Sequence, residues 1–272
     1  MLREYRRQGQ RIALVPTMGN LHAGHLALVA TARQHADVVV SSLFVNPMQF
    51  GPGEDLDAYP RTFEADQAQL TEAGCHVLFA PTVSALYPNG LAAQTRVHVP
   101  VVGEGLCGGS RPGHFDGVST VVSMLFHLVQ PDVACFGEKD YQQLVLIKQM
   151  VTDLNLDVDI VGVPTVRESD GLAMSSRNRY LDEHQREIAT TLSAALLAGN
   201  HVGRHGREAV LDAARAVLAS VPEIEVDYLE LRSPTLGPAP ENGDARLLVA
   251  ARRGDADHHG PGRGRRRHDA DR

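Results

Sequence analysis

Two histidines and several phosphate-compatible donors are the residues of this sequence most suited to chemistry. His22 and His25 lie three residues apart, where the apolar run 12–15 gives way to a second apolar segment, 26–32, that predicts a helix. Side chains three residues apart share one face of a helix, and a helix start presents unpaired N–H groups that attract phosphate. The pair therefore indicates nucleotide chemistry, with helix capping or ordinary surface residues as the alternative.

Three further polar segments supply groups that a triphosphate and a small polar substrate would need. Asn46 and Gln49 lie in a long loop, residues 137–143 have the sequence GEKDYQQ, and residues 174–178 have the sequence MSSRN. The lysine, the arginine and the two serines can stabilise negative charge as it develops, while amide side chains give neutral, directional partners. Phosphoryl and nucleotidyl transfer depend mainly on such positioning and charge stabilisation.

Strands that alternate with helices must position these segments. Such alternation predicts an α/β fold with a doubly wound, Rossmann-like parallel sheet. Ligands bind beyond the carboxyl ends of the strands in such sheets, and three of the four polar segments directly follow a predicted strand. We expect strands at 11–15, 37–44, 75–79, 132–136 and 157–163, with helices at 26–32, 63–73 and 118–130.

A change of pattern at Pro164 predicts a domain boundary. Residues 1–164 form the expected Rossmann-like domain, and residues 165–251 a smaller α+β domain with two helices and strands near 225–231 and 245–250. Residues 252–272 are rich in Arg, Asp, His and Gly, a composition that predicts disorder. We therefore also expect the small domain's sheet to keep one unpaired edge.

Bulk properties exclude several classes of protein. A net charge of −7 over 272 residues argues against a general nucleic-acid binder, although the Arg- and His-rich tail keeps a non-catalytic binding protein as a rival hypothesis. Three widely spaced cysteines indicate no disulfide framework and no metal site. Neither a membrane span nor a signal peptide is predicted, so we expect a cytoplasmic protein without a membrane partner.

Five separated motifs resemble those of the pantoate–β-alanine ligase (pantothenate synthetase) family, within the HxGH nucleotidyl-transferring Rossmann superfamily. In chain order they are VPTMGNLHAGH, LFVNPMQFGPGEDLDAYPRT, GSRPGHFDGVSTVV, FGEKDYQQ and VPTVRESDGLAMSSRNRYL. The resemblance implies ATP-dependent condensation of pantoate with β-alanine through a pantoyl-adenylate, with release of AMP and pyrophosphate. It also implies Mg²⁺ bound with ATP and a homodimer. An HxGH nucleotidylyltransferase acting on another small substrate is the alternative.

The resemblance also implies roles for particular residues. His25 and His22, with Lys139 and Arg177, would be catalytic; Gln49 and Gln143 would bind pantoate, and Gln49 would also meet β-alanine. The implied ATP-binding residues are Met18, Gly19, Asn20, Leu21, His22, Ala23, Gly24, His25, Gly137, Glu138, Lys139, Asp140, Val166, Met174, Ser175, Ser176 and Arg177.

Overall fold

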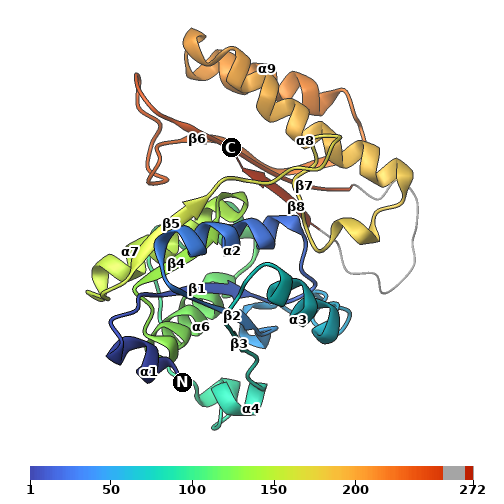
Figure 1. The fold of residues 1–272 in the computed structure, drawn as a ribbon. Coiled ribbons are helices and arrows are strands. Elements are labelled where there is room, and N and C mark those ends of the chain that lie inside the picture. Colours follow the sequence, from blue (N-terminus) through green and yellow to red (C-terminus); the bar gives the residue numbers. More distant parts are fainter. Residues whose placement is uncertain (254–266, 272) are drawn as a thin grey trace. The chain divides into compact units, whose positions relative to one another are not determined.

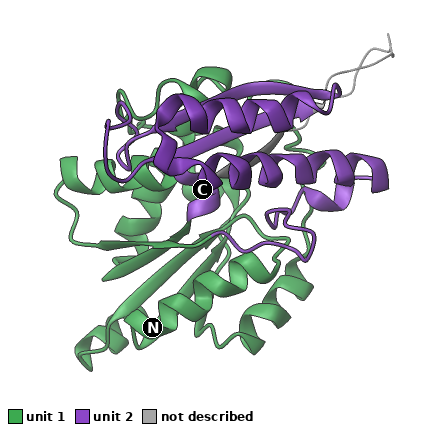
Figure 2. Ribbon diagram, turned by 90° about the horizontal axis from the view of Figure 1, so that it is seen from above, with its two compact units in different colours: residues 1–137, 143–164 green, residues 138–142, 165–272 purple. Residues whose placement is uncertain are grey.

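The computed structural model describes residues 1–253 and 267–271, and within them the chain forms two compact units. Unit 1 comprises residues 1–137 and 143–164, and unit 2 comprises residues 138–142 and 165–272 (Figure 2). The chain therefore leaves the first unit after Gly137, returns at Gln143 and leaves it again after Pro164.

Unit 1 contains a five-stranded parallel sheet in the order β3-β2-β1-β4-β5, as the sequence predicts. The sheet extends from β1 through β2 and β3 to one side, and through β4 and β5 to the other. Strand order thus reverses between β1 and β4, which is where doubly wound sheets bind ligands. The strands are β1 (Ile12–Thr17), β2 (Val38–Leu43), β3 (Val77–Phe79), β4 (Val133–Gly137) and β5 (Asp159–Val163).

Helices cover both faces of this sheet, because its central strands are apolar on both sides. Ala13 and Val15 of β1 pack in one cluster with Val29 of α2 (Ala23–His35) and Leu70 of α3 (Phe63–Glu72). Figure 1 shows α6 (His114–Val129) on the other side of the sheet, where Phe126 meets Phe136 of β4 at 6.4 Å between ring centroids. The remaining helices of this unit are α1 (Leu2–Arg7), α4 (Val83–Leu86), α5 (Leu106–Ser110) and α7 (Tyr141–Asp153), whose first two residues belong to unit 2.

Unit 2 has the α+β composition that the sequence predicts. Helices α8 (Glu183–His201) and α9 (Arg207–Ala219) pack against β6 (Ile224–Arg232) and β7 (Arg246–Arg253). Their shared core is apolar and consists of Leu192, Ala195, Leu196, Val210, Leu211, Ala214, Leu218, Leu231, Leu247, Val249 and Ala251.

The expectation that residues 252–272 are disordered, leaving an unpaired sheet edge, is wrong for part of the segment. Strand β8 (Arg267–Asp271) pairs antiparallel with β7 in register Val249↔Ala270 and completes a three-stranded sheet. A polar strand can pair because the ladder is formed by backbone groups, which every non-proline residue carries. The rest of the expectation, residues 254–266 and 272, lies outside the described residues.

Candidate active site

The HxGH segment forms the junction between β1 and α2, and its two histidines cap the helix. His22 is the N-cap residue, and its Nδ1 accepts the backbone N–H of Gly24 at 3.2 Å. Nδ1 of His25 accepts the backbone N–H of His22 at 3.3 Å, and the two ring centroids lie 4.0 Å apart. Because Nδ1 is the acceptor in both rings, a neutral imidazole carries its proton on Nε2. Each histidine therefore presents a neutral N–H donor at a helix start.

A buried carboxylate that sequence reasoning missed supports the turn before these histidines. Asp66 of α3 is 2% exposed and accepts the backbone N–H groups of Asn20 at 2.9 Å and Leu21 at 2.8 Å. The hydroxyl of Thr62 donates to the same carboxylate at 3.0 Å. Gly19 has a φ of +86°, and a Cβ there would lie 2.9 Å from Asp66 Oδ2, so this position requires glycine. The Asp66 carboxylate thereby holds the backbone of this turn in place.

Gln49 is brought to the HxGH turn through Met18. The side-chain amide of Gln49 lies 3.2 Å from Met18 Sδ, and its Oε1 accepts a hydrogen bond from Asn46 Nδ2 at 3.1 Å. Asn46 is 1% exposed and also binds the carbonyl of Gly117 and the hydroxyl of Tyr87, at 3.1 and 2.7 Å. Gln49 closes the short 3₁₀ helix η1 (Pro47–Gln49), so two predicted site segments meet within unit 1.

An arginine–glutamate pair lies behind Gln49 and was also missed by the sequence reading. Arg111 binds both oxygens of Glu54 through one edge of its guanidinium, with Nε–Oε1 at 2.7 Å and NH2–Oε2 at 2.5 Å. His114 Nδ1 lies 2.8 Å from the backbone carbonyl of Gln49 and Nε2 lies 3.1 Å from Arg111 NH1. Burial by itself raises the pKa of the Glu54 carboxyl, but the hydrogen bond and charge of Arg111 outweigh it and leave that pKa below its ordinary value.

The remaining predicted residues of unit 1 lie at the ends of β4 and in α7. Gly137 is the last residue of β4, the strand beside β1, and Gln143 is half-buried in the first turn of α7. The carboxyl ends of β1 and β4 thus carry the first and third polar segments of the sequence, as a doubly wound sheet requires.

Predicted site residues of unit 2 fall in two segments. The 3₁₀ helix η3 (Glu138–Asp140) carries Lys139, whose Nζ lies 3.5 Å from Asp140 Oδ1. Glu138 pairs with Arg246 of β7 at 3.3 Å, and the Arg246 guanidinium lies 4.2 Å from the ring centroid of Tyr141. These contacts join the GEKDY segment to the C-terminal sheet.

The second segment is a narrow loop with an ordered base. Val166 accepts the backbone N–H of Met174 at 2.9 Å, which closes the loop, and Ser175 Oγ accepts the N–H of Arg177 at 3.2 Å. Met174, Ser175, Ser176 and Arg177 are all half-buried. These two hydrogen bonds order the backbone of the segment that carries the serines and the arginine.

Metal and membrane sites find little support in the described part of the chain. No group of three or more His, Cys, Asp or Glu side chains there is arranged to hold a metal ion. Among those same residues no helix has the length and apolarity needed to cross a membrane. Cys75, Cys107 and Cys135 are free thiols.

This sheet order, with histidine donors at its first strand–helix junction, defines a nucleotide-using enzyme of the HxGH Rossmann class. The family model for pantoate–β-alanine ligase matches residues 1–257, and the chain belongs to that family. Members of the family are ATP-dependent, AMP-forming ligases.

Individual relatives agree with the family assignment. The pantothenate synthetase of Mycolicibacterium smegmatis is 64% identical over 253 residues, which cover 93% of this chain and 80% of that protein. The crystal structure of pantothenate synthetase from Thermus thermophilus is similar with a TM-score of 0.88 and 47% identity, covering 100% of this chain and 96% of that one. A pantoate–β-alanine ligase from Francisella tularensis, solved with β,γ-ATP and β-alanine, has a TM-score of 0.75 and 30% identity, over 99% and 93% of the two chains.

Proposed function

We propose that this chain condenses pantoate with β-alanine in two steps at the expense of ATP. A carboxylate oxygen of pantoate attacks the α-phosphorus of ATP, and the bond to the departing pyrophosphate breaks. The β-alanine amine then attacks the acyl carbon of the pantoyl-adenylate, loses a proton and releases AMP. The histidine capping box carries the proposal, because it places two neutral N–H donors at a helix start that already favours phosphate.

His22 and His25, aided by Lys139 and Arg177, stabilise charge on the α-phosphate and on the leaving pyrophosphate. The first step needs no general base, since a carboxylic acid is ionised at neutral pH. The segments 18–25, 137–140 and 174–177, with Val166, bind ATP; the Francisella complex with β,γ-ATP and β-alanine supports both ligands.

Gln49 and Gln143 bind pantoate, and Gln49 also meets β-alanine. Amides suit this role because pantoate carries hydroxyl and carboxylate groups that need both donors and acceptors. The hydrogen bond from Asn46 to Gln49 Oε1 supports it by fixing the orientation of the Gln49 amide.

Mg²⁺ enters with ATP, and its charge assists departure of pyrophosphate. We place the reaction in the cytoplasm, and the three free thiols support this location. We also propose that the protein assembles as a homodimer. Residues 1–164 bind ATP and pantoate, and the 165–178 segment acts as a lid that protects the adenylate from water.

Exchange of labelled pyrophosphate into ATP tests the function. We expect exchange that requires pantoate but not β-alanine, since the adenylate forms before the amine reacts. Folded protein without exchange would remove the ligase function, and exchange that requires a different acid would change the substrate. The nucleotidylyltransferase alternative is not favoured by the family match, and it predicts that the nucleotide stays on the product.

A further inference from the structure

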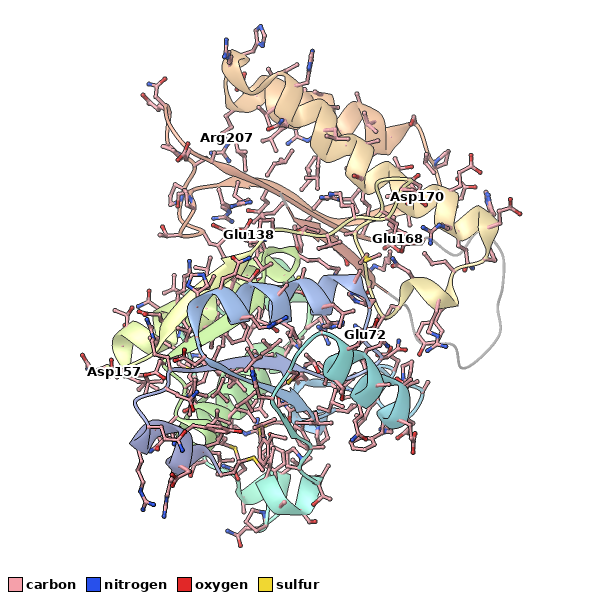
Figure 3. All side chains as sticks on the ribbon, viewed as in Figure 1. Glu72, Glu138, Asp157, Glu168, Asp170 and Arg207 are labelled. Carbon is pink, nitrogen blue, oxygen red and sulfur yellow. The ribbon has the colours of Figure 1, made fainter. Side chains whose placement is uncertain are left out.

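Arg186 binds two carboxylates in the turn of the 165–178 segment, those of Glu168 and Asp170. It lies in the first turn of α8, directly after the capping box that Asp182 forms with Gln185. Arg186 NH2 lies 2.7 Å from Glu168 Oε2, and its Nε lies 2.8 Å from Asp170 Oδ2. Figure 3 shows Glu168 and Asp170 close together on the segment alongside α8.

Glu168 also forms a hydrogen bond with the far end of the 165–178 segment. Glu168 Oε1 accepts a hydrogen bond at 2.8 Å from Asn178 Nδ2, which also donates to the carbonyl of Ala173 at 2.9 Å. Asn178 is 8% exposed, and its backbone N–H donates to the carbonyl of Ser175 at 3.0 Å. An unbroken chain of hydrogen bonds therefore runs from Arg186 through Glu168 and Asn178 to Ser175.

The turn between the two ends is closed by its own backbone. Glu168 and Leu172 are joined by a hydrogen bond of 2.8 Å, and Asp170 accepts the N–H of Leu172 at 3.1 Å. Arg186 thus attaches this backbone-closed turn to helix α8. The Ser175–Arg177 loop follows directly on this fixed base.

Charges in this network favour its ionised form. Burial raises the pKa of Glu168, but hydrogen bonds from Arg186 and Asn178 outweigh it and lower that pKa below its ordinary value. The N–H of Leu172, and after it Arg186, lowers the pKa of Asp170. The planar guanidinium of Arg186 can donate to both ionised carboxylates at once, and the single ammonium of a lysine lacks this geometry.

We propose that Arg186 is a positioning residue for adenylate formation, acting through Glu168 and Asn178 to set the Ser175–Arg177 loop against ATP. The proposal rests on the function proposed above for that loop. It assigns to Arg186 no contact with substrate.

The test compares Arg186→Gln with Arg215→Gln in the full chain. Arg215 is a matched control, because it also pairs with an aspartate, Asp212 at 2.9 Å, but on the exposed face of α9. We expect Arg186→Gln to raise the KM for ATP in pyrophosphate exchange about tenfold, the size of one charged hydrogen bond, with the KM for pantoate within about twofold. Arg186→Lys should recover part of the loss, and Arg215→Gln should change neither constant.

Coupling gives a second readout. Glu168→Gln should raise the KM for ATP, and adding it to Arg186→Gln should have less than the additive effect, because both break one chain of contacts. Equal increases in both KM values, or an Arg186→Gln enzyme within twofold of Arg215→Gln, would overturn the proposal. If Arg186→Gln does not fold, Arg186→Lys and Glu168→Gln decide by the same criteria. Calorimetric measurement of ATP affinity distinguishes failure of this proposal from failure of the proposed function. If the wild-type protein shows no pyrophosphate exchange, the proposed function is wrong. If all variants bind ATP with equal affinity, the proposed role of Arg186 is wrong.

Discussion

Nδ1 of His25 accepts the backbone N–H of His22 at 3.3 Å, so the second histidine of the motif caps the first. The position that sequence reasoning assigns to chemistry is therefore also a structural position of α2. Under the proposed function, a substitution at His25 therefore changes helix capping and phosphate stabilisation together, unless the replacement retains one of them.

His25→Gln and His25→Ala separate the two roles. Glutamine is a normal residue at the third position of a capping box and should retain most of the stability, whereas alanine should lose about 1 kcal/mol of unfolding free energy. Both should lower single-turnover adenylation by about 10²–10³, the loss typical of one transition-state donor. Urea unfolding and rapid-quench kinetics measure the two effects. Near-normal adenylation in either variant would contradict the catalytic role.

Asp66→Asn should distort the turn at Asn20 and Leu21, to which we assign ATP binding, although Asp66 itself has no proposed contact with substrate. An amide can accept through only one oxygen, so one of the two backbone N–H groups of Asn20 and Leu21 loses its partner, at a cost of about 1–3 kcal/mol. We expect a higher KM for ATP together with this loss of stability. Thr62→Val is the control, because it removes one hydroxyl donor and leaves both backbone bonds intact. Equal effects of the two variants would show that the backbone bonds are unimportant.

Glu54 should stabilise unit 1 in a pH-dependent way. Its pKa is lower in the folded than in the unfolded chain, so the contribution is complete above the ordinary value of 4.5 and is lost as pH falls through the folded-state pKa. The stability difference between wild type and Glu54→Gln should therefore shrink on acidification from pH 6 to pH 3. Urea unfolding across that range measures it, with the exposed Glu64→Gln of α3 as the control. A constant difference would mean that the Arg111 pair does not control the titration.

Gln143→Ala should weaken pantoate binding and leave ATP affinity within a few fold. The reason is its position in the first turn of α7, next to the strand that ends at Gly137. Calorimetric titration with each ligand separately measures the effect. A loss confined to ATP would reverse the assignment of this residue.

Removing the last strand should loosen β7. Leu248, Val249 and Ala250 are at most 1% exposed and lie between β6 and β8. In a chain that ends at Arg253, we expect amide exchange in β7 at least about tenfold faster, because local opening exposes a new sheet edge. Exchange in β4 serves as the internal control. Unchanged β7 protection would mean that β8 contributes little to the sheet.

Local patterns predicted much of the architecture, but they could not predict contacts between distant segments. Apolar runs located all five parallel strands, and HxGH was found because strand, turn and helix follow one another directly. Asp66 and Arg111 were missed because their importance depends on partners 46 and 62 residues away, Asn20 and Gln49. Strand β8 was missed because its composition is polar and its pairing depends only on the backbone.

The approach of α6 to η1 has a consequence for mutational tolerance. A Cβ at Gly117 would lie 2.5 Å from the carbonyl oxygen of Met48 and 2.6 Å from the backbone nitrogen of Gln49. Both atoms belong to the peptide group that joins Met48 to Gln49, so neither can move away from Gly117 without moving the backbone of Gln49. In a saturation screen for growth, Gly117 should therefore tolerate as few replacements as the histidines do, although it has no side chain that could take part in the reaction. Intolerance at Gly117 would reflect the close approach of two backbone segments. A screen of this kind, used alone, would therefore wrongly assign a catalytic role to a residue of α6.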